Sequence, residues 1–398
     1  MQTIKTIRIL PIVVISQFCC TSLWFASNGV MSNLVTAFNL NTNAIGHLTS
    51  AIQFGFITGT LVFAILTIAD RFPPSKVFFV CALLGAFFNV GIIWTGHNLT
   101  SLLLLRFLTG FFLAGIYPVG MKIAADHFKK GLGKSLGFLV GALVLGTAFP
   151  HLLKGLVDVS MWTSVIITTS GIAVLGGLLM VIFVPNGPYR IAAIRLDISA
   201  FSKVFMNSDF RSAAFGYFGH MWELYTFWAF VPVILKTYSN LHPGVNFNIP
   251  ILAFIIIGIG ALGCVLAGYI SETLGTKRVA FTALLLSGIC CIFCPFLFSI
   301  TSEIVFIGFL IFWGIVVIAD SPLFSTLVAQ NAKPDIKGTA LTIVNCIGFS
   351  ITIVSLLLFN MFVDTTNSLI VYMVLAIGPL FGLLALSSQK KYRPSSNN

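Results

Sequence analysis

Leu66-Thr-Ile-Ala-Asp70-Arg71-Phe-Pro-Pro-Ser-Lys76 is repeated, without gaps, as Gly268-Tyr-Ile-Ser-Glu272-Thr-Leu-Gly275-Thr-Lys277-Arg278. Each residue of the second stretch lies 202 positions after its counterpart in a chain of 398 residues. Both stretches follow a long apolar run, place an acid near its end, and place bases before the next apolar run. Because the offset is close to half the chain, the repeat indicates two halves of the same architecture.

The composition excludes a water-soluble protein. Hydrophobic residues make up 58% of the chain and charged residues only 8%, whereas soluble domains carry about 25% charged residues. A helix that crosses a bilayer needs about 20 apolar residues, and runs of this kind can be placed at 10–37, 43–69, 77–96, 101–122, 135–156, 162–184, 211–236, 250–271, 279–299, 302–327, 338–363 and 367–388. We therefore predict an all-α membrane protein with twelve transmembrane helices.

The charge distribution predicts the orientation of these helices. The chain has 22 Lys and Arg against 11 Asp and Glu, a net charge of +11. The bases lie in every second loop, as the positive-inside rule describes for cytoplasmic loops; only Lys154 and Lys236 fall on the other side, and Arg106 lies inside a run. We therefore expect both termini in the cytoplasm, and we read the excess of bases as topological rather than as a nucleic-acid-binding face.

A more polar connection divides the chain. It opens with Pro-Asn-Gly-Pro at Pro185 and separates six apolar runs from six. We predict a first six-helix bundle over residues 1–184, a cytoplasmic linker over 185–209 and a second six-helix bundle over 210–398. Pro118 near the end of the fourth run and Pro322 near the end of the tenth repeat the symmetry.

These motifs resemble those of the major facilitator superfamily, and the resemblance covers the whole chain. Ala69-Asp70-Arg71-Phe72 with Lys76 matches the centre of the loop motif that the family carries after its second helix, although Leu66 and Pro73 stand where the family prefers glycine. Arg106-Phe-Leu-Thr-Gly110 matches the motif of the fourth helix. The run Gly216–Tyr225 is loosely similar to the bacterial nitrate/nitrite and cyanate branches. The resemblance implies two pseudo-symmetric six-helix bundles in a bacterial inner membrane.

The repeated loops are the expected gates. An acid at the end of one helix and bases at the start of the next can pair in one conformation and separate in another. We expect the inner loops to pair when the cavity faces outward, through Asp70, Arg71 and Lys76 in the first half and Glu272, Lys277 and Arg278 in the second.

Two ionisable groups stand out within the apolar runs. Arg106 either reaches outward as an anchor or acts as a cavity cation that binds an anion or pairs with an acid, because arginine is costly in hydrocarbon unless it is relieved. Glu223 lies near the middle of the seventh run, and His220 precedes it by three positions on the same helix face. A charged carboxylate is expensive at that depth, so Glu223 is the candidate proton-coupling or substrate-orienting group; a static ion pair or an acid bonded to its own helix is the alternative.

Further candidates are less specific. Asp320 precedes Ser321-Pro322, where it either caps a loosened helix or serves as a second titrating site. His151 follows Pro150 in the fifth run and is similarly ambiguous. Polar and aromatic residues expected to line a cavity, although most aromatics pack or face lipid, are Trp24, Asn28, Gln53, Tyr117, Trp222, Tyr225, Trp228 and Asn345.

The sequence therefore predicts a secondary transporter, not an enzyme. No nucleotide-binding loop, metal-ligand cluster or nucleophile is evident, so we expect no cofactor and an ion gradient as the energy source. The favoured function is proton-coupled uptake of a small anion by a monomer surrounded by lipid; the alternative is proton-antiport efflux of lipophilic or cationic compounds. The Gly-Pro pair typical of exporters in the fifth helix is absent, and Phe149-Pro150-His151 stands there instead.

Overall fold

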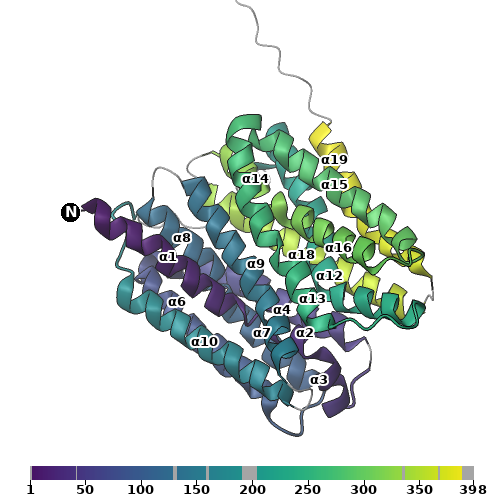
Figure 1. The fold of residues 1–398 in the computed structure, drawn as a ribbon. Coiled ribbons are helices and arrows are strands. Elements are labelled where there is room, and N and C mark those ends of the chain that lie inside the picture. The colour runs from purple at the N-terminus through teal and green to yellow at the C-terminus, as the bar shows by residue number, and fades with distance from the viewer. Residues whose placement is uncertain are drawn as a thin grey trace, which may run out of the picture.

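A computed structural model describes residues 2–41, 43–128, 132–157, 161–190, 204–333, 337–365 and 368–387. Over these residues the chain is helical and contains no strand. The helices run up and down the molecule, and the first and second halves of the chain form two groups that lie side by side (Figure 1).

The first half supplies six crossings. Within it α4 packs on α7, α6 packs on α10, and α1 lies against both α9 and α10. The short helix α5 (Ile68–Arg71) lies in the connection between the second and third crossings. The crossings are α1 (Gln2–Thr21) with α2 (Ala26–Gly29) and α3 (Met31–Ala37), α4 (Ala44–Ile65), α6 (Pro74–Val90) with η1 (Gly91–Ile93), α7 (Leu99–Leu113) with α8 (Tyr117–His127), α9 (Leu132–Leu156), and α10 (Trp162–Phe183).

The second half supplies the other six. Here α12 packs on α18 and α19, and α15 packs on α16 and η4. The crossings are α12 (Ser208–Leu241), α13 (Ile249–Gly258) with α14 (Gly260–Leu274), α15 (Thr276–Leu297), α16 (Glu303–Ala319) with α17 (Ser321–Asn331), α18 (Lys337–Thr365), and η4 (Leu369–Ala376) with α19 (Ile377–Ser387). Most of the linker expected at 185–209 lies outside the described residues.

The helices have the length and composition of membrane spans. Ten of the described segments are long and apolar enough to cross a bilayer, and α1 adds a shorter apolar stretch, Ile9–Thr21. The remaining crossing is α12, a helix of 34 residues that carries several polar side chains, among them His220 and Glu223. The predicted twelve-helix architecture is therefore confirmed.

Several crossings are interrupted, which the apolar runs alone did not predict. The first run was expected to form one helix over residues 10–37, but α1 ends at Thr21 and the chain restarts as α2 and α3. The last crossing begins as the 3-10 helix η4. Pro118 and Pro322 lie in the first turn of α8 and α17, where the missing N–H group needs no partner. These interruptions free backbone groups, and side chains must then satisfy them.

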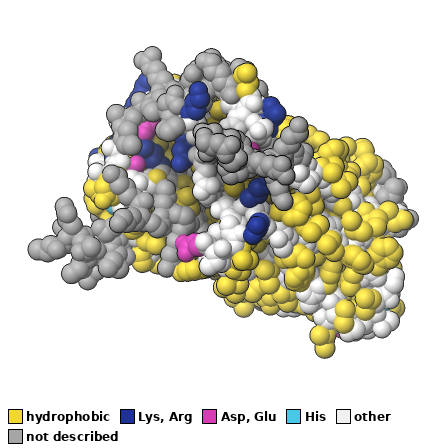
Figure 2. All heavy atoms as spheres, turned by 90° about the horizontal axis from the view of Figure 1, so that it is seen from above, with side chains coloured by type: hydrophobic (Ala, Val, Ile, Leu, Met, Phe, Trp, Pro, Cys, Tyr) yellow, Lys and Arg dark blue, Asp and Glu magenta, His cyan; other side chains and the backbone are white. Residues whose placement is uncertain are grey.

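The two groups of helices meet along two long contacts. Helix α9 packs on α13 and α14, and α4 packs on α18. Lys and Arg side chains gather on one part of the face shown in Figure 2, and the rest of that face is mostly hydrophobic. We call the end that carries Lys122 of α8 and Lys277 and Arg278 of α15 the basic end. At the opposite end, the Nδ2 of Asn360 on α18 donates to the carbonyl oxygen of Asn43 at 3.3 Å, so the first and second halves are in contact there.

Candidate functional site

Arg106 donates hydrogen bonds to the backbone where the helix of the first crossing is interrupted. It comes from α7 and is 1% exposed. Its Nη1 donates to the carbonyl oxygen of Leu23 at 3.1 Å, and its Nη2 donates to the carbonyl oxygen of Trp24. Because α1 has already ended at Thr21, these carbonyls have left the helical ladder. The guanidinium supplies the donors that this buried turn requires.

Asn89 of α6 orients the same guanidinium. Its Oδ1 accepts from Arg106 Nη1 at 3.3 Å, and its Nδ2 donates to the hydroxyl of Ser170 on α10 at 3.0 Å. Arg106 is therefore buried among neutral polar groups of the first half and does not reach outward as an anchor. Both of its terminal nitrogens donate to backbone in this conformation.

Four aromatic rings, called here the ring cluster, fill the middle of the interface between the two halves. They are Trp24, Phe56, Tyr225 and Phe349, from the break after α1 and from α4, α12 and α18. The Trp24 ring stacks on Tyr225 and on Phe349 with centroids 5.7 Å apart in each case, and Phe56 lies 4.6 Å from Phe349. Trp24 and Tyr225 were expected to line a cavity, but in this conformation rings from both halves pack against each other here.

Buried polar atoms without hydrogen-bond partners lie on the same segments as the ring cluster. Four side chains have polar atoms with no hydrogen-bond partner among the described residues. These atoms are the indole Nε1 of Trp24 and of Trp228, the Nε2 and Oε1 of the Gln53 amide, and the hydroxyl of Ser27. Trp228 contacts the ring cluster edge-on through Tyr225, with centroids 5.3 Å apart. Each unpartnered buried polar group costs about 1–3 kcal/mol. A solute that offered donors and acceptors here would remove that cost.

Glu223 lies on the other side of α12, inside the second half. It is 1% exposed. Its Oε1 accepts from the Trp313 Nε1 of α16 at 2.6 Å and from the hydroxyl of Ser287 on α15. The Trp313 ring also contacts the Phe227 ring in a tilted arrangement, at a centroid distance of 4.2 Å. The carboxyl group is therefore removed from lipid and held by these donors, and the Cys291 side chain is a further hydrogen-bond partner.

His220 and Asp320 form a buried pair one turn away from Glu223. The Nδ1 of His220 lies 2.8 Å from the Oδ1 of Asp320, and the two side chains are 1% and 0% exposed. Asp320 occupies the junction between α16 and α17. We refer to Glu223, His220 and Asp320 together as the acid cluster. It contains two carboxyl groups and one imidazole, so its net charge depends on protonation.

The other predicted lining residues are more dispersed. Asn28 is buried, and its Nδ2 donates to Thr49 Oγ1 at 2.8 Å. Tyr117 is half-buried at the start of α8 and lies within electrostatic range of Tyr217 in the second half. His151 is 2% exposed, and its Nε2 has no partner among the described residues. Asn345 is half-buried on α18, one turn before Phe349.

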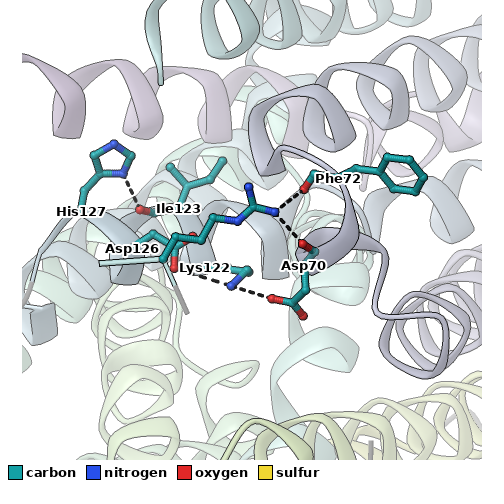
Figure 3. A network of polar contacts seen from close by, with 7 residues as sticks. Asp70, Phe72, Lys122, Ile123, Asp126 and His127 are labelled. Carbon is teal, nitrogen blue, oxygen red and sulfur yellow. Dashed lines mark hydrogen bonds and ion pairs between the residues drawn. The ribbon is translucent and has the colours of Figure 1, made fainter. Parts of the chain in front are cut away.

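The first predicted gate is an ion-pair network within the first half (Figure 3). Lys122 of α8 lies 2.9 Å from Asp70 and 3.6 Å from Asp126. The Nη2 of Arg190, which follows the sixth crossing, donates to the carbonyl oxygens of Asp70 at 2.6 Å and of Phe72 at 2.9 Å. Arg71 Nε donates to the hydroxyl of Thr67 at 3.1 Å, and Lys76 is exposed.

The second predicted gate is built differently. Lys277 and Arg278 begin α15 and line a groove at the basic end, together with Gln330 of α17. Glu272, the counterpart of Asp70, is exposed near the end of α14. The structure therefore keeps the repeated loop in both halves but surrounds it with different neighbours.

The comparison with protein families identifies the family of this chain. The model of the Major Facilitator Superfamily matches residues 13–356. The chain belongs to the major facilitator superfamily. Proteins of this superfamily are transporters and not enzymes, so this member is a multi-pass membrane transporter. No curated protein is similar enough in sequence to count as a match.

Solved structures share the fold at low sequence identity. A D-xylose-proton symporter has a TM-score of 0.76 and 16% identity, with 95% of each chain covered. The proton:xylose symporter XylE bound to 6-bromo-6-deoxy-D-glucose has a TM-score of 0.74 and 14% identity, covering 96% of this chain and 95% of that one. A bacterial homologue of the human lysosomal transporter Spinster, inward-facing and unoccupied, has a TM-score of 0.73 and 14% identity, covering 96% and 97%.

The sequence of this superfamily member did not predict the polar partners of Arg106 and Glu223. Asn89, Ser287 and Trp313 were not predicted, although they bond to Arg106 or Glu223. A single amide or hydroxyl within an apolar run was the available signal, since buried polar groups need partners. The signal could not identify the partner, because the pairs are far apart in sequence. The suggested nitrate and cyanate branch stays a prediction.

Proposed function

We propose that this transporter couples the movement of a small solute to protons bound by the acid cluster. The observation that carries the proposal is the burial of Glu223, His220 and Asp320 in the second half, with no Lys or Arg partner among the described residues. Two carboxyl groups and one imidazole in a low-dielectric interior favour states of low net charge. Taking up or releasing a proton there changes the energy of the whole cluster.

Helix α12 connects the acid cluster to the interface. It carries His220 and Glu223 toward α15–α17, and it carries Tyr225 and Trp228 into contact with Trp24 and Phe25 of the first half. A change of protonation that alters the packing of α12 would therefore also alter the contact between halves. A solute and a proton that both favour one arrangement would shift the population toward it.

The solute site of the proposal is the ring cluster with its unpartnered polar atoms. Once the two halves separate, Trp24, Gln53 and Trp228 would present donors and an amide to the opening space. Binding sites that combine apolar faces with a few polar groups are typical for small molecules. We therefore propose the ring cluster as the lining of the central cavity.

We favour an uncharged solute over the small anion predicted from sequence. The anion prediction depends on Arg106 as a free cation, but both terminal nitrogens of Arg106 donate to backbone carbonyls in this conformation. Two of the similar structures are described as proton:xylose symporters, and this supports testing neutral hydroxylated solutes first. The transport of xylose is a property of those two proteins.

The gates complete the proposed cycle. We propose that the Asp70–Lys122 pair and the loop of Lys277 and Arg278 rearrange as the halves rock against each other. We propose a monomer in a bacterial inner membrane, and the clustering of bases at one end (Figure 2) supports an orientation with that end in the cytoplasm. A green fluorescent protein fused to the C-terminus should then fluoresce, whereas fused alkaline phosphatase should stay inactive; the opposite pattern would overturn the orientation.

Proteoliposomes test the coupling and the solute class together. A pH-sensitive dye inside the vesicles should report acidification when a transported solute is added outside without any imposed gradient. The panel contains labelled pentoses and hexoses, labelled small monocarboxylates, and a lipophilic cationic dye. Acidification with a neutral solute supports the proposal; transport of a panel member with no proton movement contradicts coupling. Proton-linked movement of monocarboxylates alone would restore the anion prediction, and proton-driven extrusion of the dye would establish the efflux alternative.

A further inference from the structure

The groove at the basic end of the second half has a volume of about 780 Å³. It lies between the connection of α14 with α15 and the end of α17. Both charged and apolar side chains line it: Leu274, Lys277, Arg278, Phe281, Leu327 and Gln330. Arg278 is exposed, and Leu274 is 58% exposed. A ligand that fits the groove must therefore combine an anionic or strongly polar part with an apolar part.

An apolar stripe leads along α14 to the groove. Its members are spaced by four residues, so they lie on one face of the helix. They are all exposed on the surface of the protein, at 57%, 55%, 45% and 58% for Leu262, Leu266, Ile270 and Leu274. The stripe reaches the groove at Leu274. In a bilayer this face contacts acyl chains, and its end by the groove marks where a lipid headgroup would lie.

The equivalent place in the first half is covered by the chain itself. There Arg190 donates to the carbonyl oxygens of Asp70 and Phe72, and the Tyr189 N–H donates to that of Asp126 at 3.0 Å. The loop of the first half is therefore closed by its own protein segment. Lys76 aligns with Arg278 in the repeat. Its side chain also carries a positive charge, but it lies outside the groove of the second half.

We propose that the groove binds the phosphate of an anionic phospholipid, whose acyl chains lie along the stripe on α14. Basic pockets between membrane helices bind anionic headgroups in this way. Asp209 at the start of α12 lies within electrostatic range of Lys277, so Arg278 is the principal phosphate contact. The proposal concerns the lipid around the transporter and does not depend on the solute or the coupling ion.

Thermal unfolding and native mass spectrometry of the full chain test this site. In detergent containing phosphatidylcholine, added phosphatidylglycerol should raise the midpoint temperature of the wild type and appear as a retained bound lipid. Arg278→Gln, and the double change Lys277→Gln with Arg278→Gln, should lose most of that rise and the retained lipid. Lys76→Gln is the matched control and should keep both.

Four outcomes would overturn the proposal. One is an unchanged phosphatidylglycerol effect in both groove variants, and another is an equal loss in Lys76→Gln. The third is that inorganic phosphate or glycerol phosphate alone reproduces the rise, because a soluble anion would then be the ligand. The fourth is loss of the effect in a chain ending at Ser387, because Lys390, Lys391 and Arg393 would then hold the lipid. Since Arg278 is exposed, the single variant keeps the test valid if the double variant folds poorly.

Discussion

Arg106 shows how a buried charge in a membrane protein can serve the backbone. The sequence marks it as an expensive residue within an apolar run, and both interpretations offered for it concerned its charge. In the structure its terminal nitrogens satisfy the carbonyls of Leu23 and Trp24, where α1 has ended. Its hydrogen bonds therefore position Trp24, which is the first-half member of the ring cluster. The run around Trp24 looks continuous and apolar, so this arrangement could not be predicted from sequence.

Removing this guanidinium should destabilise the fold. Arg106→Met leaves two buried carbonyls without their donors, at a cost of about 1–3 kcal/mol each. Arg106→Lys should recover only part of the loss, because one ammonium group cannot match the planar fork of donors. Thermal unfolding in detergent measures both variants. A wild-type midpoint temperature for Arg106→Met, combined with loss of solute binding, would instead make Arg106 a substrate-binding cation.

At the scale of the elements, the apolar runs predicted where the crossings lie because hydrocarbon thickness fixes their length. The breaks were harder to predict. Pro322 signalled the one in the tenth crossing, whereas the break after Thr21 has no proline to mark it. Glu223 and His220 were found because their spacing places them on one face of one helix. Ser287 and Trp313 were not, because they approach from other helices.

Close contact between α4 and α7 gives a prediction at this scale. A methyl group added to Gly110 would lie 2.0 Å from the carbonyl oxygen of Ile52, so Gly110→Ala must push the two helices apart. Overpacking of this kind costs about 1–3 kcal/mol, and the midpoint temperature should fall. Gly308→Ala is the control, because no heavy atom lies within 4 Å of its added methyl group. Equal effects of the two substitutions would contradict the close packing.

For the whole molecule, the duplication within the sequence predicted two halves, and the structure adds how they touch. Helix α9 lies along α13 and α14, α4 lies along α18, and Asn360 closes on Asn43 at the end opposite the bases. The ring cluster blocks the middle of the same interface. The contact between halves depends on the conformational state, and a sequence that must form more than one state does not specify which of them is observed.

Locking the end opposite the bases should stop transport. In a chain whose eight native cysteines are replaced, Asn43→Cys and Asn360→Cys place thiols at positions whose backbone and side chain now share a hydrogen bond of 3.3 Å. Cross-linking them should abolish solute movement, and reduction should restore it, because alternating access requires this end to open. The single-cysteine variants should be unaffected. Transport at the uncross-linked rate through the linked protein would contradict the rocking movement.

The protonation of Glu223 is the centre of this account, and one comparison of two transport modes in proteoliposomes tests it most directly. Glu223→Gln keeps an oxygen acceptor for Trp313 and Ser287 but cannot lose a proton. The account predicts that this variant still exchanges labelled for unlabelled solute at equilibrium but no longer accumulates it against a gradient when protons are supplied from outside. Glu303→Gln, at an exposed glutamate, should accumulate solute like the wild type. Accumulation by Glu223→Gln at the wild-type level would contradict the account.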